Sequence, residues 1–234
     1  MRVLEPRICD FVNRDGLHAH YEVYGDGDPT VFLLMPDTIV HSRAWKAQIP
    51  FLARSFQVVT VDPIGNGLSD RPSSSAQFDF ANLLDDAWHV LDTIGAERAV
   101  LVGLCSGCAQ AVMMAADRPE RVLGVFAINP GLALTPPAPH RTRYDFEAVL
   151  ETDEGWAKRN RHYWLRDWPG FAQFFFAEMF PEPHSTKQLE DCVAWATETT
   201  PEVMLLDVDS EPDPRLIGDA AIEACRQVAC PVSV

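Results

Sequence analysis

A chain of 234 residues is long enough for one sizeable hydrophobic core with an added subdomain, and it is short for two independent domains. Its formal net charge of −15 repels nucleic-acid phosphates and anionic lipids, so we expect neither nucleic acid nor a membrane as a partner. No run of residues approaches the roughly 20 apolar residues of a membrane span, and the first residues lack the apolar stretch of a secretory signal. We therefore expect a cytoplasmic protein.

Strand and helix patterns alternate along the first part of the chain. Residues 7–12 and 18–24 predict a hairpin that turns at residues 13–16. Apolar runs without alternation predict strands buried on both faces, at residues 30–34, 57–61, 99–102 and 122–128. Apolar residues at helical spacing predict helices between them, over residues 84–91 and 109–116. Strands that alternate with helices indicate βαβ units, so the predicted fold class is α/β with a largely parallel sheet.

The pattern of alternating strands and helices ends at residue 135. Four residues there, 136–139, include three prolines, and an aromatic-rich helical stretch is predicted from residue 144 to about residue 196. Residues 216–228 then predict a return helix, and residues 230–234 the start of another strand. We interpret the middle part as a helical insertion between two strands of the sheet, with packing as the ordinary role of its aromatic side chains.

Six cysteines are scattered through the chain, which does not indicate the dense disulfide framework of a small secreted domain. Four of them are expected to be small buried apolar residues: Cys9, Cys192, Cys225 and Cys230. The other two, Cys105 and Cys108, form a Cys-x-x-Cys sequence where a predicted strand meets a predicted helix. This placement is also found in thioredoxin-like redox proteins, and a reversible disulfide between the two thiols is a further possibility.

The segment around Cys105 carries the main chemical signal. A buried strand runs into Gly103-Leu104-Cys105-Ser106-Gly107, and a helix rich in small residues follows. A strained turn from strand to helix exposes a nucleophile, and glycines two residues to either side allow the chain segments to approach closely. The N-terminus of a helix lowers the pKa of a thiol and offers backbone N–H groups to an oxyanion. The pattern predicts that Cys105 is a nucleophile.

A second motif supports the interpretation of the strand-to-helix turn at Gly103–Gly107, which is called the elbow below. Asp62-Pro-Ile-Gly65-Asn-Gly67-Leu-Ser69 follows the strand at residues 57–61. Together with the elbow, it resembles the α/β-hydrolase fold family, in particular its lid-bearing members, which usually have serine at the position of Cys105. The resemblance implies a doubly wound sheet, with residues 1–134 as the core, 135–215 as a helical lid or cap, and 216–234 as the return helix and the beginning of the next core strand.

The same resemblance implies the roles of individual residues. Cys105 would be the nucleophile, and the backbone N–H groups of Ser106 and Asp37 would form the oxyanion hole. Gly103 and Gly107 would be the glycines of the elbow. The resemblance implies no cofactor, and no metal site stands out in the sequence. Asp37 departs from the family pattern, because its carboxylate would lie beside a developing negative charge.

The catalytic acid and histidine are not identified. The family usually places the acid after the seventh strand and the histidine after the eighth. Six strands are predicted here and the seventh begins at the last residues, so we expect both groups beyond Val234 and expect this chain alone not to be a competent catalyst. None of the available histidines is assigned as the base, although His41 is the nearest to the predicted site in sequence. The others are His18, His20, His89, His140, His162 and His184.

These features predict a hydrolase that forms an acyl-enzyme with a hydrophobic ester, thioester or lactone-type carbonyl substrate. Two alternatives remain open. One is an acyltransferase of the same fold, and the other is a non-catalytic ligand-binding or sensor domain that keeps the pocket. The sequence does not identify the substrate or the oligomeric state.

Overall fold

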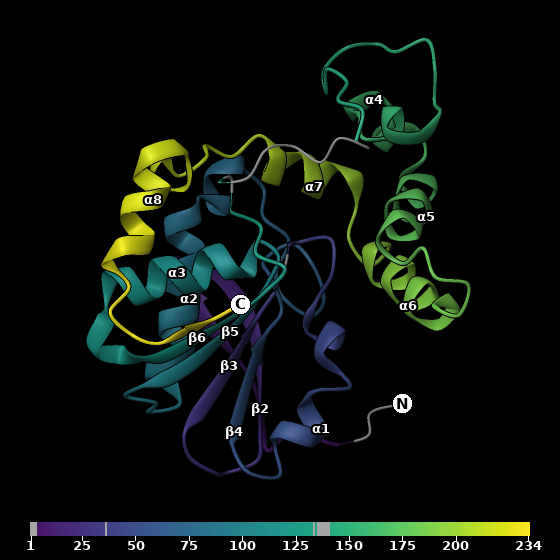
Figure 1. Cartoon of the computed structure of the whole chain (residues 1–234). Helices are drawn as coiled ribbons and strands as arrows, with labels where there is room; N and C mark the ends of the chain where they lie inside the picture. Colours follow the sequence, from purple (N-terminus) through teal and green to yellow (C-terminus); the bar gives the residue numbers. More distant parts are fainter. Residues whose placement is uncertain (1–3, 36, 133, 135–140) are drawn as a thin grey trace.

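The computed structural model describes residues 4–35, 37–132, 134 and 141–234, and a sheet of seven strands lies at its centre (Figure 1). The strands are β1 (Ile8–Arg14), β2 (Leu17–Tyr24), β3 (Thr30–Leu34), β4 (Gln57–Val61), β5 (Ala99–Leu104), β6 (Val122–Ile128) and β7 (Val232–Ser233). Their order is β1-β2-β4-β3-β5-β6-β7. β1 and β2 are antiparallel to their neighbours, and the other five run parallel. The predicted α/β class with a largely parallel sheet is confirmed.

Helices follow most of the strands. The α-helices are α1 (Ile49–Leu52), α2 (Phe80–Thr93), α3 (Gly107–Asp117), α4 (Arg161–Arg166), α5 (Trp168–Met179), α6 (Thr186–Ala196), α7 (Pro201–Val208) and α8 (Gly218–Gln227). Single turns of 3-10 helix lie at Ser42–Trp45, Ser75–Phe78, Pro119–Arg121, Gly155–Lys158 and Pro214–Leu216. None of the helices among the described residues is long and apolar enough to cross a bilayer.

Two hydrophobic cores cover the two faces of the sheet. One contains Trp88 of α2 and Met113 of α3, packed with sheet residues such as Phe32. The other contains Ile49 of α1 and aromatic residues of α4 and α5, packed with sheet residues such as Leu33. Because β3 and β4 supply side chains to both cores, their apolar runs do not alternate, as the sequence predicts for strands buried on both faces.

The hairpin at the start of the chain is longer than predicted. β1 continues to Arg14, because the turn needs only Asp15 and Gly16, which both have positive φ angles, 53° and 86°. Arg14 is therefore a strand residue, and its guanidinium reaches the carboxylate of Asp86 on α2 at 2.8 and 3.1 Å.

The helical insertion between β6 and α8 begins later than predicted. Residues 141–154 contain no helix, and the first α-helix, α4, starts after Asn160, whose side chain accepts hydrogen bonds from the N–H groups of His162 and Tyr163. Figure 1 shows α4, α5 and α6 set to one side of the sheet, with α7 leading back towards it. Trp164 and Phe171 pack with ring centroids 4.8 Å apart, so these aromatic side chains do contribute to packing.

Candidate active site

Cys105 lies at a sharp turn between β5 and α3. Its φ angle is +53°, in the left-handed region that a cysteine rarely adopts. Hydrogen bonds hold the turn on both sides. The Cys105 N–H donates to the Ile128 carbonyl at 3.0 Å, and the Cys105 carbonyl accepts from the Gly131 N–H at 2.9 Å. The backbone is thus strained and firmly fixed, and Cys105 as a residue stays exposed, although protein atoms surround part of its thiol.

Three glycines make room for this turn. A Cβ atom on Gly103 would lie 2.5 Å from the Gly107 carbonyl oxygen, and one on Gly107 would lie 2.6 Å from the Met35 oxygen. A Cβ atom on Gly131 would lie 2.9 Å from the carbonyl carbon of Cys105. The elbow motif in the sequence includes Gly103 and Gly107 but not Gly131. Only the folded chain brings Gly131, which follows β6, to the nucleophile turn.

Asp62 organises the loops near the elbow. It is buried, and it accepts hydrogen bonds from His20 Nδ1 at 3.1 Å and from the N–H groups of Ser42 and Leu68 at 3.0 Å each. Burial by itself would raise the pKa of Asp62, but these hydrogen bonds outweigh it and lower the pKa to about 2. Asp62 is therefore an ionised structural anchor.

The rest of the Asp62 motif positions the loop that carries Asp37. Asn66 Nδ2 donates to the Thr38 carbonyl at 2.8 Å. Gly67 has a φ of +56°, and a Cβ atom there would lie 2.4 Å from the Asp62 carboxylate. The motif that resembles the family segment thus joins the loop after β4 to the loop after β3.

The charge of Asp37 acts on the thiol of Cys105. Protein atoms that exclude water raise the pKa of Cys105, and the charge of Asp37 raises it further, while the Ser106 N–H and Arg141 act in the opposite direction. The helix N-terminus alone predicts a lowered pKa for this thiol, so that sequence-based expectation is wrong in direction. Burial and the neighbouring carboxylate outweigh the helix end.

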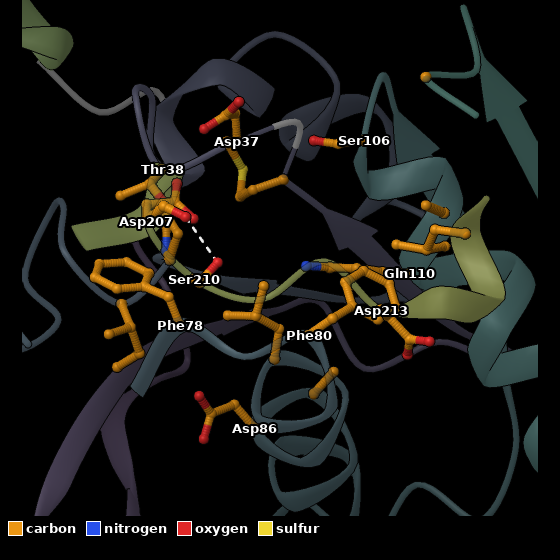
Figure 2. A pocket seen from close by; sticks show the side chains of 18 of the residues that line it. Asp37, Thr38, Phe78, Phe80, Asp86, Ser106, Gln110, Asp207, Ser210 and Asp213 are labelled. Atoms are coloured by element: carbon orange, nitrogen blue, oxygen red, sulfur yellow. Dashed lines mark hydrogen bonds between the residues drawn. The ribbon is translucent and has the colours of Figure 1, made fainter. Parts of the chain in front are cut away.

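A cavity of about 380 Å³ adjoins the elbow. Its lining includes Asp37, Thr38, Ser106, Gln110, Phe78 and Asp207 (Figure 2). Cys105 is not among the lining residues in the described part of the chain, so the cavity reaches the elbow through Ser106. We find no sequence signal that identifies Asp207 as a lining residue, because it belongs to a run of late acidic residues.

Asp207 of α7 and Asp37 form a pair of interacting carboxyl groups. Loss of hydration raises the pKa of Asp207 to about 7, and the charge of Asp37 adds to this rise, while a hydrogen bond with the Thr38 side chain opposes it. Asp37 is open to the cavity, but protein atoms around its carboxyl group exclude water and raise its pKa. Hydrogen bonds from the N–H groups of Thr38 and Ile39 lower the pKa and only partly offset this effect. At neutral pH the pair therefore holds a proton for part of the time.

His41 lies where the core meets the helical insertion. It is buried, with Nδ1 3.8 Å from Asp62 and Nε2 3.4 Å from the Glu198 carboxylate. Its ring packs edge-on against Trp195 at 5.6 Å. None of the contacts described for His41 joins it to Cys105. Of the other histidines, His18 and His20 lie on β2, His89 is exposed on α2, and His140 lies outside the described residues.

Cys108 is buried one helical turn after Cys105, and its thiol donates to the Gly103 carbonyl at 3.1 Å. Both thiols are free. Burial raises the pKa of Cys108. Cys9, which is expected from the sequence to be buried, is exposed; Cys192, Cys225 and Cys230 are half-buried.

Comparisons with known proteins agree with this architecture. Residues 33–176 match the family described as alpha/beta hydrolase fold. The chain is 35% identical over 196 residues to 2-hydroxymuconate semialdehyde hydrolase of Pseudomonas sp. strain CF600, a match that covers 76% of this chain and 68% of that protein. It is 25% identical over 166 residues to epoxide hydrolase 4 of Mus musculus, covering 71% of this chain and 44% of the mouse protein.

A solved structure shows the same fold. An enzyme described as degrading N-acyl homoserine lactones superposes with a TM-score of 0.68, over 95% of this chain and 79% of that chain, at 23% identity. The sheet order, the elbow and the family match together show that this chain belongs to the α/β-hydrolase fold family. It spans about half the length of several of the curated relatives that it matches.

Proposed function

We propose that this protein is a hydrolase that attacks a hydrophobic ester, thioester or lactone-type carbonyl compound with the thiol of Cys105. The observation that carries the proposal is the φ of +53° at Cys105, an exposed residue held between β5 and α3. Strain of this kind persists only where the surrounding structure enforces it, and it is common at nucleophiles. Curated relatives named as hydrolases support the reaction class.

The reaction that we propose has two steps. The Cys105 thiolate attacks the carbonyl carbon, the bond to the leaving oxygen or sulfur breaks, and the leaving group takes up a proton, which leaves an acyl thioester on Cys105. Water then attacks the thioester, releasing the carboxylic acid and restoring the thiol. The N–H groups of Ser106 and Asp37 are proposed to stabilise the oxyanion in both steps.

The cavity beside Ser106 is the proposed substrate site. Apolar residues such as Phe78, Phe80 and Leu83 line it together with the carboxyl groups described above. Such a mixture suits a compound with an apolar body and a polar carbonyl end. The helical insertion, proposed to act as a lid, contributes Asp207 of α7 to the same cavity.

Deacylation is expected to be the weak step in the described chain. A water molecule normally needs a general base to attack an acyl-enzyme, and no described contact brings a histidine to Cys105. The raised pKa of Cys105 also keeps the thiolate fraction low near neutral pH. We therefore propose that this chain acylates once and releases the acyl group slowly.

Hydrolysis of p-nitrophenyl acetate by the 234-residue protein tests the proposal. The expected result is at most one equivalent of p-nitrophenol, with an acetyl group found on Cys105 by peptide mass spectrometry. Cys105→Ser should lose both signals, because a serine without a base is a poor nucleophile, while Cys225→Ser on α8 should keep them. Product release that survives Cys105→Ser would overturn the proposal.

The fate of the acetyl group separates two alternatives. The raised pKa of Cys105 lowers the thiolate fraction and so favours a non-catalytic sensor. A sensor would bind p-nitrophenyl acetate reversibly and form no acetyl adduct. An acyltransferase predicts that an added alcohol or thiol removes the acetyl group faster than water does.

A further inference from the structure

Three metal-binding side chains converge on the hairpin formed by β1 and β2, outside the proposed active site. Cys9 of β1 is paired with Glu22 of β2, and His20 lies two residues before Glu22 on the same face of the strand. One ligand atom from each of the three, a sulfur, a nitrogen and an oxygen, lies within 4.8 Å of the others. Cys9 Sγ and His20 Nε2 are 3.2 Å apart.

The His20 ring is held in the orientation that a metal ligand needs. Its Nδ1 lies 3.1 Å from the buried carboxylate of Asp62. In the tautomer that donates Nδ1–H to this carboxylate, the lone pair of Nε2 faces Cys9, whose Sγ is 3.2 Å away. A carboxylate that orients a histidine in this way is the usual outer partner of a metal-bound imidazole.

Depth and access also suit a bound ion. His20 and Glu22 are 2% and 1% exposed, whereas Cys9 is exposed and opens the cluster to solvent. The Tyr24 hydroxyl donates to the Glu22 carboxylate and fixes one of its oxygens. Cys9 and Glu22 each make a further interaction, with which an ion would have to compete.

We propose that Cys9, His20 and Glu22 bind a zinc ion. Thiolate, imidazole and carboxylate are all zinc ligands, at about 2.3, 2.0 and 2.1 Å. Tetrahedral geometry with these bond lengths puts sulfur and nitrogen about 3.5 Å apart, close to the 3.2 Å between Cys9 and His20. The three ligand atoms lie within 4.8 Å of one another, so bringing all of them onto one zinc ion requires side-chain adjustments of at most about 1 Å. The Cys9 thiol loses its proton to solvent on binding, and water completes the coordination.

Such an ion would join β1 to β2 and, through His20 and Asp62, to the loops beside the elbow. The ion would also protect the thiol of Cys9, which is the most accessible one outside the active site, against oxidation and alkylation. The proposal does not depend on the reaction at Cys105.

The test uses tag-free protein that has been treated with EDTA and dialysed. Zinc binding is followed by calorimetry, and cobalt replaces zinc to report a sulfur ligand through its near-ultraviolet charge-transfer absorption. We expect one equivalent of zinc, a cobalt–thiolate band, and at least about tenfold slower alkylation of Cys9 when zinc is present. Alkylation of Cys225 should not change.

Variants separate the cluster from other sites. Because Cys9 is exposed, we expect Cys9→Ser to keep the fold. It should abolish the cobalt–thiolate band and weaken zinc binding by about tenfold or more. Glu22→Gln, once shown to be folded by circular dichroism, should weaken binding to a similar degree. Cys225→Ser is the matched control. Absence of stoichiometric zinc binding by the native protein, or binding that Cys9→Ser leaves unchanged, would overturn the proposal.

Discussion

Asp207, near the end of α7, interacts electrostatically with Asp37, in the loop after β3, across the cavity that adjoins the elbow (Figure 2). The chain thus brings a second carboxyl group from its helical insertion to the carboxyl group beside the proposed nucleophile. Two like charges in a partly dehydrated site favour the protonated form of one of them. This relationship gives the first two predictions.

The first prediction concerns the pH dependence of stability. The pKa of Asp207 is about 7 in the folded chain, compared with 3.8 for an ordinary aspartate. Ionisation of Asp207 therefore lowers the free energy of unfolding as pH rises from about 4 to about 7, and the full loss is present above pH 7. Asp207→Asn should therefore stabilise the protein more at pH 8 than at pH 5, by at least about 1 kcal/mol in urea unfolding. Glu202→Gln, on the exposed side of the same helix, is the control, and an equal gain at both pH values would contradict the prediction.

The second prediction concerns the reactivity of Cys105. The charge of Asp37 raises the pKa of the thiol, so Asp37→Asn should increase the rate of Cys105 alkylation at pH 8 several-fold. Asparagine keeps a side-chain oxygen for the N–H groups of Thr38 and Ile39. Peptide mapping after brief iodoacetamide treatment measures the rate. Glu211→Gln, which removes another charge from the cavity lining, should have less effect.

The third prediction concerns the glycines of the elbow. Gly103→Ala places a Cβ atom 2.5 Å from backbone oxygen, where neither partner can move without disrupting the turn. We expect a loss of about 3 kcal/mol of unfolding free energy, or failure to fold. Gly107→Val should behave similarly. At Gly124 on β6 the nearest atom is 3.4 Å away, so Gly124→Ala should be tolerated. Unchanged melting of Gly103→Ala together with unchanged Cys105 labelling would argue against a strained elbow.

The fourth prediction concerns the buried ion pair between Arg14 and Asp86. Both side chains are nearly inaccessible, and the guanidinium makes two contacts with the carboxylate. Asp86→Ala should destabilise the protein by about 3–5 kcal/mol, because it leaves the Arg14 charge buried without its partner. Thermal unfolding measures the loss, and Asp85→Ala, at the exposed neighbouring position, serves as the reference. A loss of the same small size in both variants would show that the pair is not buried in solution.

Some features of this protein follow from the sequence alone. The strands at Thr30–Leu34, Gln57–Val61 and Val122–Ile128 have the predicted bounds, because an uninterrupted apolar run bounded by turn residues leaves few other arrangements. The α/β class follows from the alternation of such runs with helical spacing. The elbow sequence around Cys105 likewise identifies a strand-to-helix turn, since its glycines are needed there for local steric reasons.

Other features are decided only by tertiary structure. Three of these features join residues that are distant in sequence or lie in adjacent strands: Asp207 with Asp37, Gly131 with Cys105, and Cys9 with His20. Their meeting depends on packing and register, which no local pattern specifies. The direction of the Cys105 pKa is the clearest case. The helix end is visible in the sequence, but the burial and the carboxylate that outweigh it arise when the loop after β3 folds against the elbow.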